Sequence, residues 1–169
     1  FEKKYARCGC FEYYASGEGI ANVAREFLED QKDYNGELKD KHIEKLTSYD
    51  VFTAYAVNTS YAVNTSYDVF TAYDNGDPLA ARVIKLCVEL WGMAVANLVS
   101  LFNPEKIIMG GGIFGPAIPL IPEIKIEAAK WAQPIGINQV SLDVSGLAGD
   151  AGVYGAGFLA LKQIGRAHV

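Results

Sequence analysis

Three consecutive glycines, Gly110-Gly111-Gly112, directly follow a short apolar run at positions 106–109. Such a run bounded by glycines predicts a buried β-strand that ends in a glycine loop. Because glycine has no Cβ, the backbone of this loop lets a flat or charged ligand approach closely. The carboxyl end of a strand is also where open α/β sheets bind ligands. The triplet matches neither the GxGxxG nor the GxxxxGK[ST] motif, so a ligand contact and a simple tight turn both remain open.

A second group of reactive side chains lies near the start of the chain. Cys8 and Cys10 form a C-x-C pair, which suits a metal better than a disulfide. Zinc takes three or four such ligands, so the pair is at most part of a zinc site, and two unligated thiols are the alternative. Glu12 directly precedes a predicted helix, where its carboxylate could accept hydrogen bonds from hydroxyl groups. The alternative is a solvated carboxylate favoured by the helix dipole.

Two long helices are predicted before the glycine triplet. Apolar residues recur at helical spacing after Ser16, which can cap the first helix. Asp77 and Pro78 are typical of a second helix start, and Asn103-Pro104 ends that helix. Beyond Leu90 this second helix is apolar nearly all round, which predicts that its second half is buried. Its continuous apolar stripe comprises Leu79, Val83, Leu86, Leu90, Ala94, Leu98 and Leu101.

The elements after the second helix alternate between strands and helices. Strands are predicted at 106–109 and 140–144, with a helix centred on 123–131 between them. A final helix rich in small residues spans 151–163 and begins after Asp150. This order predicts an α/β fold with a parallel βαβ unit.

Composition excludes several classes of protein. The chain has 169 residues, half of them hydrophobic, and a net charge of −5. Its Lys and Arg residues are scattered, so no nucleic-acid partner is expected. The apolar runs contain polar or helix-breaking residues and fall short of the ~20 residues of a membrane span, so we expect no membrane association. Three cysteines do not make a secreted disulfide framework, and no secretion signal begins the chain, so we expect a reducing cytoplasm.

Two segments are unusual. SYDVFTAY occurs at 48–55 and again at 66–73, with AVNTSY repeated between the two copies. Two copies are too few for a solenoid, so we interpret 48–73 as a duplicated insertion in a surface loop or as an assembly artefact. The last six residues, 164–169, interrupt the helical pattern and are interpreted as a non-native tail. Residues 1–163 are therefore expected to form one domain.

Taken together, three segments resemble the ROK family of sugar kinases and repressors. CFEYYASGEGI, beginning at Cys10, resembles the family motif in which Cys-x-Cys-Gly-x-x-Gly-Cys-x-Glu precedes a Ser-Gly helix start. The stretch from Gly76 to Phe114 resembles its long helix, Asn-Pro-Glu turn, strand and Gly-Gly-Gly loop. SGLAGDAGVYGAGFLAL is similar to its terminal helix. The resemblance runs from about Cys8 to Gln163.

This resemblance implies part of an actin-like ATPase (ribonuclease H-like) fold in a glucokinase-like hexose kinase that uses ATP with Mg²⁺. Gly110, Gly111 and Gly112, with Ile113 and Phe114, would line the adenosine part of ATP. Glu12 would bind hydroxyls of the sugar substrate, and Cys8 and Cys10 would belong to a structural zinc site. The family implies a homo-oligomer. A sugar-responsive repressor is the alternative, because the family also contains transcriptional repressors.

The chain departs from the family pattern in its first residues. The Gly-x-x-Gly-Cys that should separate the C-x-C pair from x-Glu is missing, and so is the upstream histidine, so zinc binding by this chain is not expected. The catalytic aspartate is expected upstream of Phe1. We therefore expect the 169 residues to be a carboxy-terminal portion that is inactive and prone to association when isolated.

Overall fold

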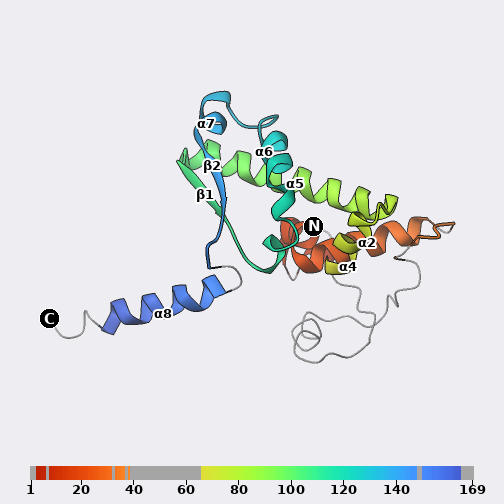
Figure 1. Ribbon diagram of the computed structural model, residues 1–169, viewed down its shortest axis with the longest axis horizontal. Coiled ribbons are helices and arrows are strands. Elements are labelled where there is room, and N and C mark those ends of the chain that lie inside the picture. The colour runs from red at the N-terminus through yellow and green to blue at the C-terminus, as the bar shows by residue number, and fades with distance from the viewer. Residues whose placement is uncertain are drawn as a thin grey trace.

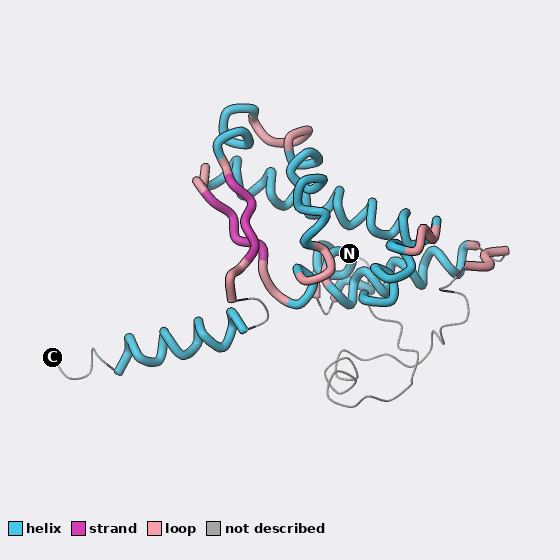
Figure 2. Tube along the Cα trace, in the orientation of Figure 1, coloured by secondary structure: helices cyan, strands magenta, loops and turns pink. Residues whose placement is uncertain are grey.

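The computed structural model describes residues 3–6, 8–31, 33–36, 38, 66–147 and 150–164. Its helices gather around one long central helix, and a small parallel sheet lies at one end of that helix (Figures 1 and 2). The elements described, in chain order, are η1 (Lys3–Tyr5), α1 (Gly9–Ala15), α2 (Gly17–Asp30), α4 (Ser66–Asp74), α5 (Pro78–Phe102), β1 (Lys106–Met109), η2 (Gly112–Phe114), η3 (Ile118–Leu120), α6 (Ile121–Ala128), α7 (Pro134–Gln139), β2 (Ser141–Val144) and α8 (Ala151–Ile164). The α/β class predicted from the sequence is confirmed.

Both long helices begin at the caps that the sequence predicts. The Ser16 hydroxyl accepts a hydrogen bond from the Gly19 amide over 3.0 Å at the start of α2. Asp77 is almost fully buried, and its Oδ1 accepts from the amides of Leu79 and Ala80, each over 2.9 Å. Asn103 ends α5 in the left-handed conformation at φ 43° and ψ 54°. Local capping chemistry therefore sets both ends of α5.

The central helix α5 buries only part of its apolar surface. It packs against α1, α2, α4 and α6, and Ile84, Cys87 and Val95 lie on its buried side. The sequence predicted that the second half of α5 is buried. This prediction is wrong for the last turn of the helix, where Leu101 and Phe102 are 74% and 71% exposed. By length and composition alone α5 could cross a membrane, but half of its apolar window is buried inside the protein, which is typical of a core helix.

The second copy of the duplicated sequence forms a core helix. Its residues lie in α4, where the side chains of Val69, Phe70 and Ala72 are buried. The interpretation of the whole of 48–73 as a surface loop is therefore wrong for this copy. Its apolar residues fall on one helical face that packs on α2 and α5. The first copy, at 48–55, lies outside the described residues, and the insertion itself stays a prediction.

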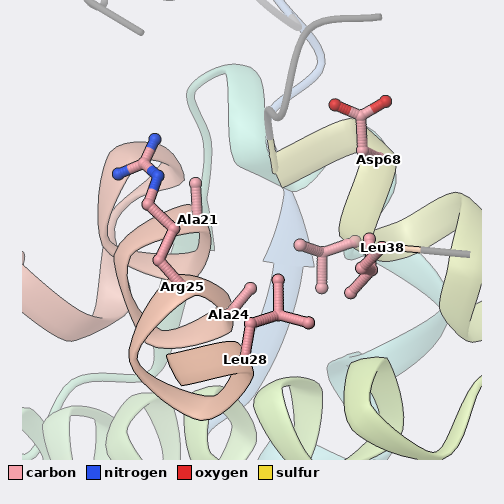
Figure 3. Close-up of a pocket in the computed structure, with 7 residues that line it drawn as sticks. Ala21, Ala24, Arg25, Leu28, Leu38 and Asp68 are labelled. Carbon is pink, nitrogen blue, oxygen red and sulfur yellow. The ribbon is translucent and has the colours of Figure 1, made fainter. Parts of the chain in front are cut away.

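The contact between α2 and α4 leaves one very small void (Figure 3). About 10 Å³ remains open there, roughly the room that one water molecule needs. Its lining comprises Ala21, Ala24, Arg25, Leu28, Leu38, Asp68 and Val69. The helices α2 and α4 pack directly against each other beside this void.

The sheet consists of two parallel strands in the described part of the chain. Lys106 pairs with Ser141 and Met109 with Val144, so β1 and β2 end side by side. The connection between them contains α6 as predicted, and also α7, which the sequence analysis missed. The predicted parallel βαβ unit is confirmed. The carboxyl ends of both strands consequently meet at the glycine triplet, where the Gly110 position faces Ser145.

The last helix, α8, projects away from the rest of the molecule (Figure 1). Its large apolar side chains are exposed, namely Val153, Tyr154, Phe158, Leu159 and Leu161. These exposed side chains show that α8 packs little against the rest of the described residues. Residues 165–169 of the predicted tail lie outside the described residues.

Candidate functional site

The glycine triplet forms an exposed turn at the end of β1. All three residues are exposed, and Gly111 adopts φ 87° and ψ 171°. This backbone region is essentially restricted to glycine, so Gly111 is required by the turn itself. A Cβ on Gly112 would meet nothing within 4 Å, and Gly112 has no such backbone requirement. The packing of the described residues therefore gives no reason for glycine at position 112.

Ile113 and Phe114 continue the turn into η2 and are half-buried. Both side chains pack against the hydrophobic core. The ring of Phe114 lies 5.5 Å from the ring of Trp91, centroid to centroid, at an interplanar angle of 49°. Aromatic pairs of this separation are stabilising. In the segment 110–114, the solvent-exposed part is therefore the backbone of the glycine triplet.

Glu12 lies in the first turn of α1, and its side chain is exposed. The carbonyl of Glu12 accepts a hydrogen bond from the Ser16 amide over 3.2 Å, which joins α1 to the cap of α2. The carboxylate borders a surface depression of about 250 Å³. The depression is lined by Lys4, Cys8, Glu12, Tyr13, Ser16, Glu18, Gly19 and Asn22. Its polar lining can accept and donate hydrogen bonds to a hydroxylated ligand.

Lys4 and the aromatic side chain of Tyr13 border the same depression. The Lys4 ammonium lies 5.3 Å from the ring centroids of Tyr5, Tyr13 and Tyr14, and 3.4 Å from the Glu26 carboxylate. The hydrogen bond with Tyr14, and then Glu26, raise the pKa of Lys4. Burial, followed by the hydrogen bond to Glu26, raises the pKa of Tyr13. At this side of the depression Lys4 therefore forms an ion pair with Glu26.

Glu12 was recognisable from the sequence in this region, but its neighbours were not. Lys4, Glu18 and Asn22 reach the depression from η1 and α2, and their spacing matches no recognised motif. Only the Ser16 cap was a usable signal, because it predicts where α2 turns against α1. Their spacing in the sequence therefore did not predict that these three polar side chains lie at one depression.

Cys8 and Cys10 are both exposed free thiols at the start of α1. Cys8 is the N-cap residue and makes no side-chain capping bond. Within the described part of the chain, no group of three or more His, Cys, Asp or Glu side chains could hold a metal. Two thiols do not complete the ligand set of a structural zinc, so these residues do not fit that ion.

The two predicted parts of the site lie on different elements. None of the residues 110–114 lines the depression around Glu12. Both parts contact α5, because Phe114 packs on Trp91 and Trp91 also bonds to α1. The structure thus joins the predicted site residues through the central helix rather than in one shared cavity.

Comparison with known proteins gives one consistent family. The ROK family model matches residues 4–163. A glucokinase of Halalkalibacterium halodurans is 33% identical over 158 residues, which cover 93% of this chain and 42% of that enzyme. The chain therefore spans less than half the length of this relative.

Solved structures show the same fold. A ROK family glucokinase from Streptomyces griseus, determined with glucose and AMPPNP, matches with a TM-score of 0.63 and 22% identity over 89% of this chain and 44% of its own. A ROK family transcriptional regulator, a homologue of the E. coli MLC protein, matches with a TM-score of 0.58 and 26% identity over 85% of this chain and 32% of its own. These matches confirm the prediction of a partial actin-like ATPase fold.

Proposed function

This chain belongs to the ROK family, and we propose that it is part of an ATP-dependent sugar kinase of the glucokinase type. The identity to a glucokinase supports a kinase, and the fold is that of ROK kinases. Because the chain covers 42% of that relative, the activity is proposed for the whole protein that contains it. The free thiols agree with a cytoplasmic protein. We expect the whole protein to be a homo-oligomer.

The observation that carries the proposal is the bare backbone at Gly112. The turn requires glycine at Gly111, but neither backbone strain nor a clash requires it at Gly112. A ligand that lies directly against the backbone would require it. In our proposal the adenosine part of ATP occupies this position, and the segment from Gly110 to Phe114 forms one wall of its pocket.

The second element of the proposal is the Glu12 depression. Its carboxylate accepts hydrogen bonds from sugar hydroxyls and so fixes the orientation of the sugar. A sugar hydroxyl then attacks the γ-phosphorus of ATP and gives its proton to a general base that we expect outside this chain, while the bond to the bridging oxygen breaks and ADP leaves. Mg²⁺ bound with ATP supplies charge neutralisation on the phosphates. We assign no catalytic base to this chain, and its role is positioning.

Substitution of Gly112 tests the nucleotide part of this proposal. In the whole protein, Gly112→Val should raise the KM for ATP about tenfold or more, since a side chain would fill the space next to the base or ribose. Gly146→Val, at another exposed glycine with open space around it, is the control and should leave this KM unchanged. Equal ATP kinetics in the two variants would contradict an adenosine wall at Gly112.

Substitution of Glu12 tests the sugar part. Glu12→Gln should raise the KM for glucose about tenfold or more, because a charge-assisted hydrogen bond is lost. Glu18→Gln alters another carboxylate of the same depression and should have a smaller effect. An unchanged KM for glucose in Glu12→Gln would remove this carboxylate from the proposed sugar site.

A sugar-responsive repressor is the second candidate, favoured by the 26% identity to the ROK transcriptional regulator. Both candidates bind a sugar, so sugar binding alone does not separate them. Phosphorylation of glucose by the whole protein would support the kinase. Sugar-dependent binding to operator DNA without phosphorylation would support the repressor.

A further inference from the structure

The side chain of Trp91 contacts both the helix that carries Glu12 and the segment that follows the glycine turn. It lies on α5 and is only 6% exposed. Its indole Nε1 donates a hydrogen bond to the Ala15 carbonyl over 2.9 Å. Its ring packs on Phe114 at a centroid distance of 5.5 Å. One side chain therefore contacts both parts of the proposed site.

The hydrogen bond to Ala15 holds the carboxyl end of α1. The last carbonyls of a helix have no partner within that helix and need one from elsewhere. Trp91 supplies this partner for Ala15, and the Cys87 thiol, one turn earlier on α5, lies 3.7 Å from the Tyr14 carbonyl. Ala15 is buried, so losing the indole donor would leave its carbonyl unsatisfied. Since Glu12 lies one helical turn before Ala15, this bond restrains the part of the α1 backbone that carries Glu12.

The ring contact between Trp91 and Phe114 restrains the glycine turn. The Phe114 amide donates to the Gly111 carbonyl over 3.1 Å, so the position of Phe114 limits the movement of the turn. Trp91 packs on the Phe114 ring from the core side. A shift of the indole would therefore change where the backbone of Gly111 and Gly112 lies.

We propose that Trp91 is a positioning residue that fixes the sugar-binding carboxylate of Glu12 and the nucleotide wall at Gly110–Phe114 relative to each other. This inference rests on the proposed function for its kinetic consequence. The structural part of the proposal does not depend on that function. It states that Trp91 restrains two separate segments through two different contacts. Two substitutions separate the contacts. Trp91→Phe keeps an aromatic ring for Phe114 but removes the indole donor, whereas Phe114→Leu removes the ring pair and keeps the donor.

Hydrogen-exchange mass spectrometry on the 169-residue chain tests whether Trp91 restrains both segments. Trp91→Phe should speed amide exchange in residues 12–17 severalfold and change residues 110–114 less. Phe114→Leu should give the opposite pattern. Trp131→Phe is the matched control, since it removes the indole bond from Trp131 to Glu127, which lies on α6. The inference would be overturned if neither test variant changed exchange in residues 12–17 or 110–114, or if Trp131→Phe changed these segments in the same way as the test variants. This outcome does not depend on enzymatic activity.

Kinetics of the whole protein test the consequence. Trp91→Phe should raise the KM for glucose about fivefold, as expected for one lost hydrogen bond, with the KM for ATP changed less than about twofold. Phe114→Leu should instead raise the KM for ATP. A fall in kcat alone, with both KM values unchanged, would indicate a merely structural role and contradict positioning. If exchange responds as expected but no sugar is phosphorylated, the proposed function fails and the restraint by Trp91 stands.

Discussion

Gly92 of α5 lies directly against the side chain of Glu127 on α6. A Cβ at position 92 would lie 2.6 Å from Cγ of Glu127, 2.7 Å from its Cβ and 3.0 Å from the Ala128 nitrogen. Carbon atoms do not approach this closely without strain, and the last of these contacts is to backbone. The absence of a side chain at Gly92 therefore permits the spacing of the two helices that carry the core and the crossover.

Gly92→Ala should consequently destabilise the protein. Alanine normally stabilises a helix interior by about 1 kcal/mol relative to glycine, but overpacking here should cost about 1–3 kcal/mol and lead to a net loss. Urea unfolding followed by circular dichroism measures the change. Gly157→Ala in α8 is the control, because nothing lies within 4 Å of that position. It should raise the helical signal without lowering the unfolding midpoint, and a Gly92→Ala variant as stable as wild type would contradict the close approach.

Glu127 should make stability depend on pH. Its hydrogen bonds with Lys130, and then with Trp131, lower its pKa from the ordinary value of 4.5. A carboxyl group with a lowered folded pKa contributes stability that is present above the unfolded pKa and is lost as the pH falls through the folded value. The stability advantage of wild type over Glu127→Gln should thus be full above about pH 4.5 and shrink below it.

Unfolding midpoints of the two proteins between about pH 3 and pH 7 check this expectation. Glu123→Gln, at an exposed carboxylate on the same helix, controls for the loss of one negative charge. A difference between wild type and Glu127→Gln that stays constant across this range would show that the ion pair with Lys130 does not act as described.

The three cysteines should fall into two classes of reactivity. Burial raises the pKa of Cys87 to about 12, whereas Cys8 and Cys10 are exposed. The thiolate is the reactive form, so an aromatic disulfide reagent at pH 8 should label Cys8 and Cys10 quickly and Cys87 only after unfolding. Cys87→Ala should remove only the thiol that is labelled slowly. Rapid labelling of all three in the folded chain would contradict the buried position of Cys87.

The isolated chain should self-associate through α8. Tyr154, Phe158 and Leu161 are exposed and lie at helical spacing on one face. An exposed apolar face of this kind favours association. Replacing Phe158 and Leu161 by Glu should shift sedimentation toward the monomer. Gln163→Glu, which adds charge without removing an apolar side chain, should shift it less, and a monomeric wild-type chain with one sharp thermal transition would contradict the expectation.

Local signals in the sequence were enough to place the two long helices, both strands and the helix between them. The Ser16 and Asp77 caps and the Asn103-Pro104 stop set the limits of α2 and α5, because each acts through hydrogen bonds or steric effects within a few residues. The short apolar runs predicted both strands, and the alternation of strand and helix predicted their parallel order. The three segments that resemble the ROK family were also sufficient for the family.

Only the tertiary structure decided which faces are buried. A helix that is apolar nearly all round has no preferred side in its own sequence, so the exposure of Leu101 and Phe102 depends on which elements pack against α5. The repeated SYDVFTAY likewise became a core helix in its second copy because α2 and α5 cover its apolar face.

The same distinction applies to the site. Glycines and a carboxylate are recognisable by residue type, so Gly110–Gly112 and Glu12 could be selected from the sequence. The place of Lys4 on the same depression as Glu12 and the position of Trp91 between Ala15 and Phe114 could not, because both depend on how separate elements pack. Sequence determines which groups are available, and long-range packing determines which of them meet, since no local interaction encodes the distance between separate helices.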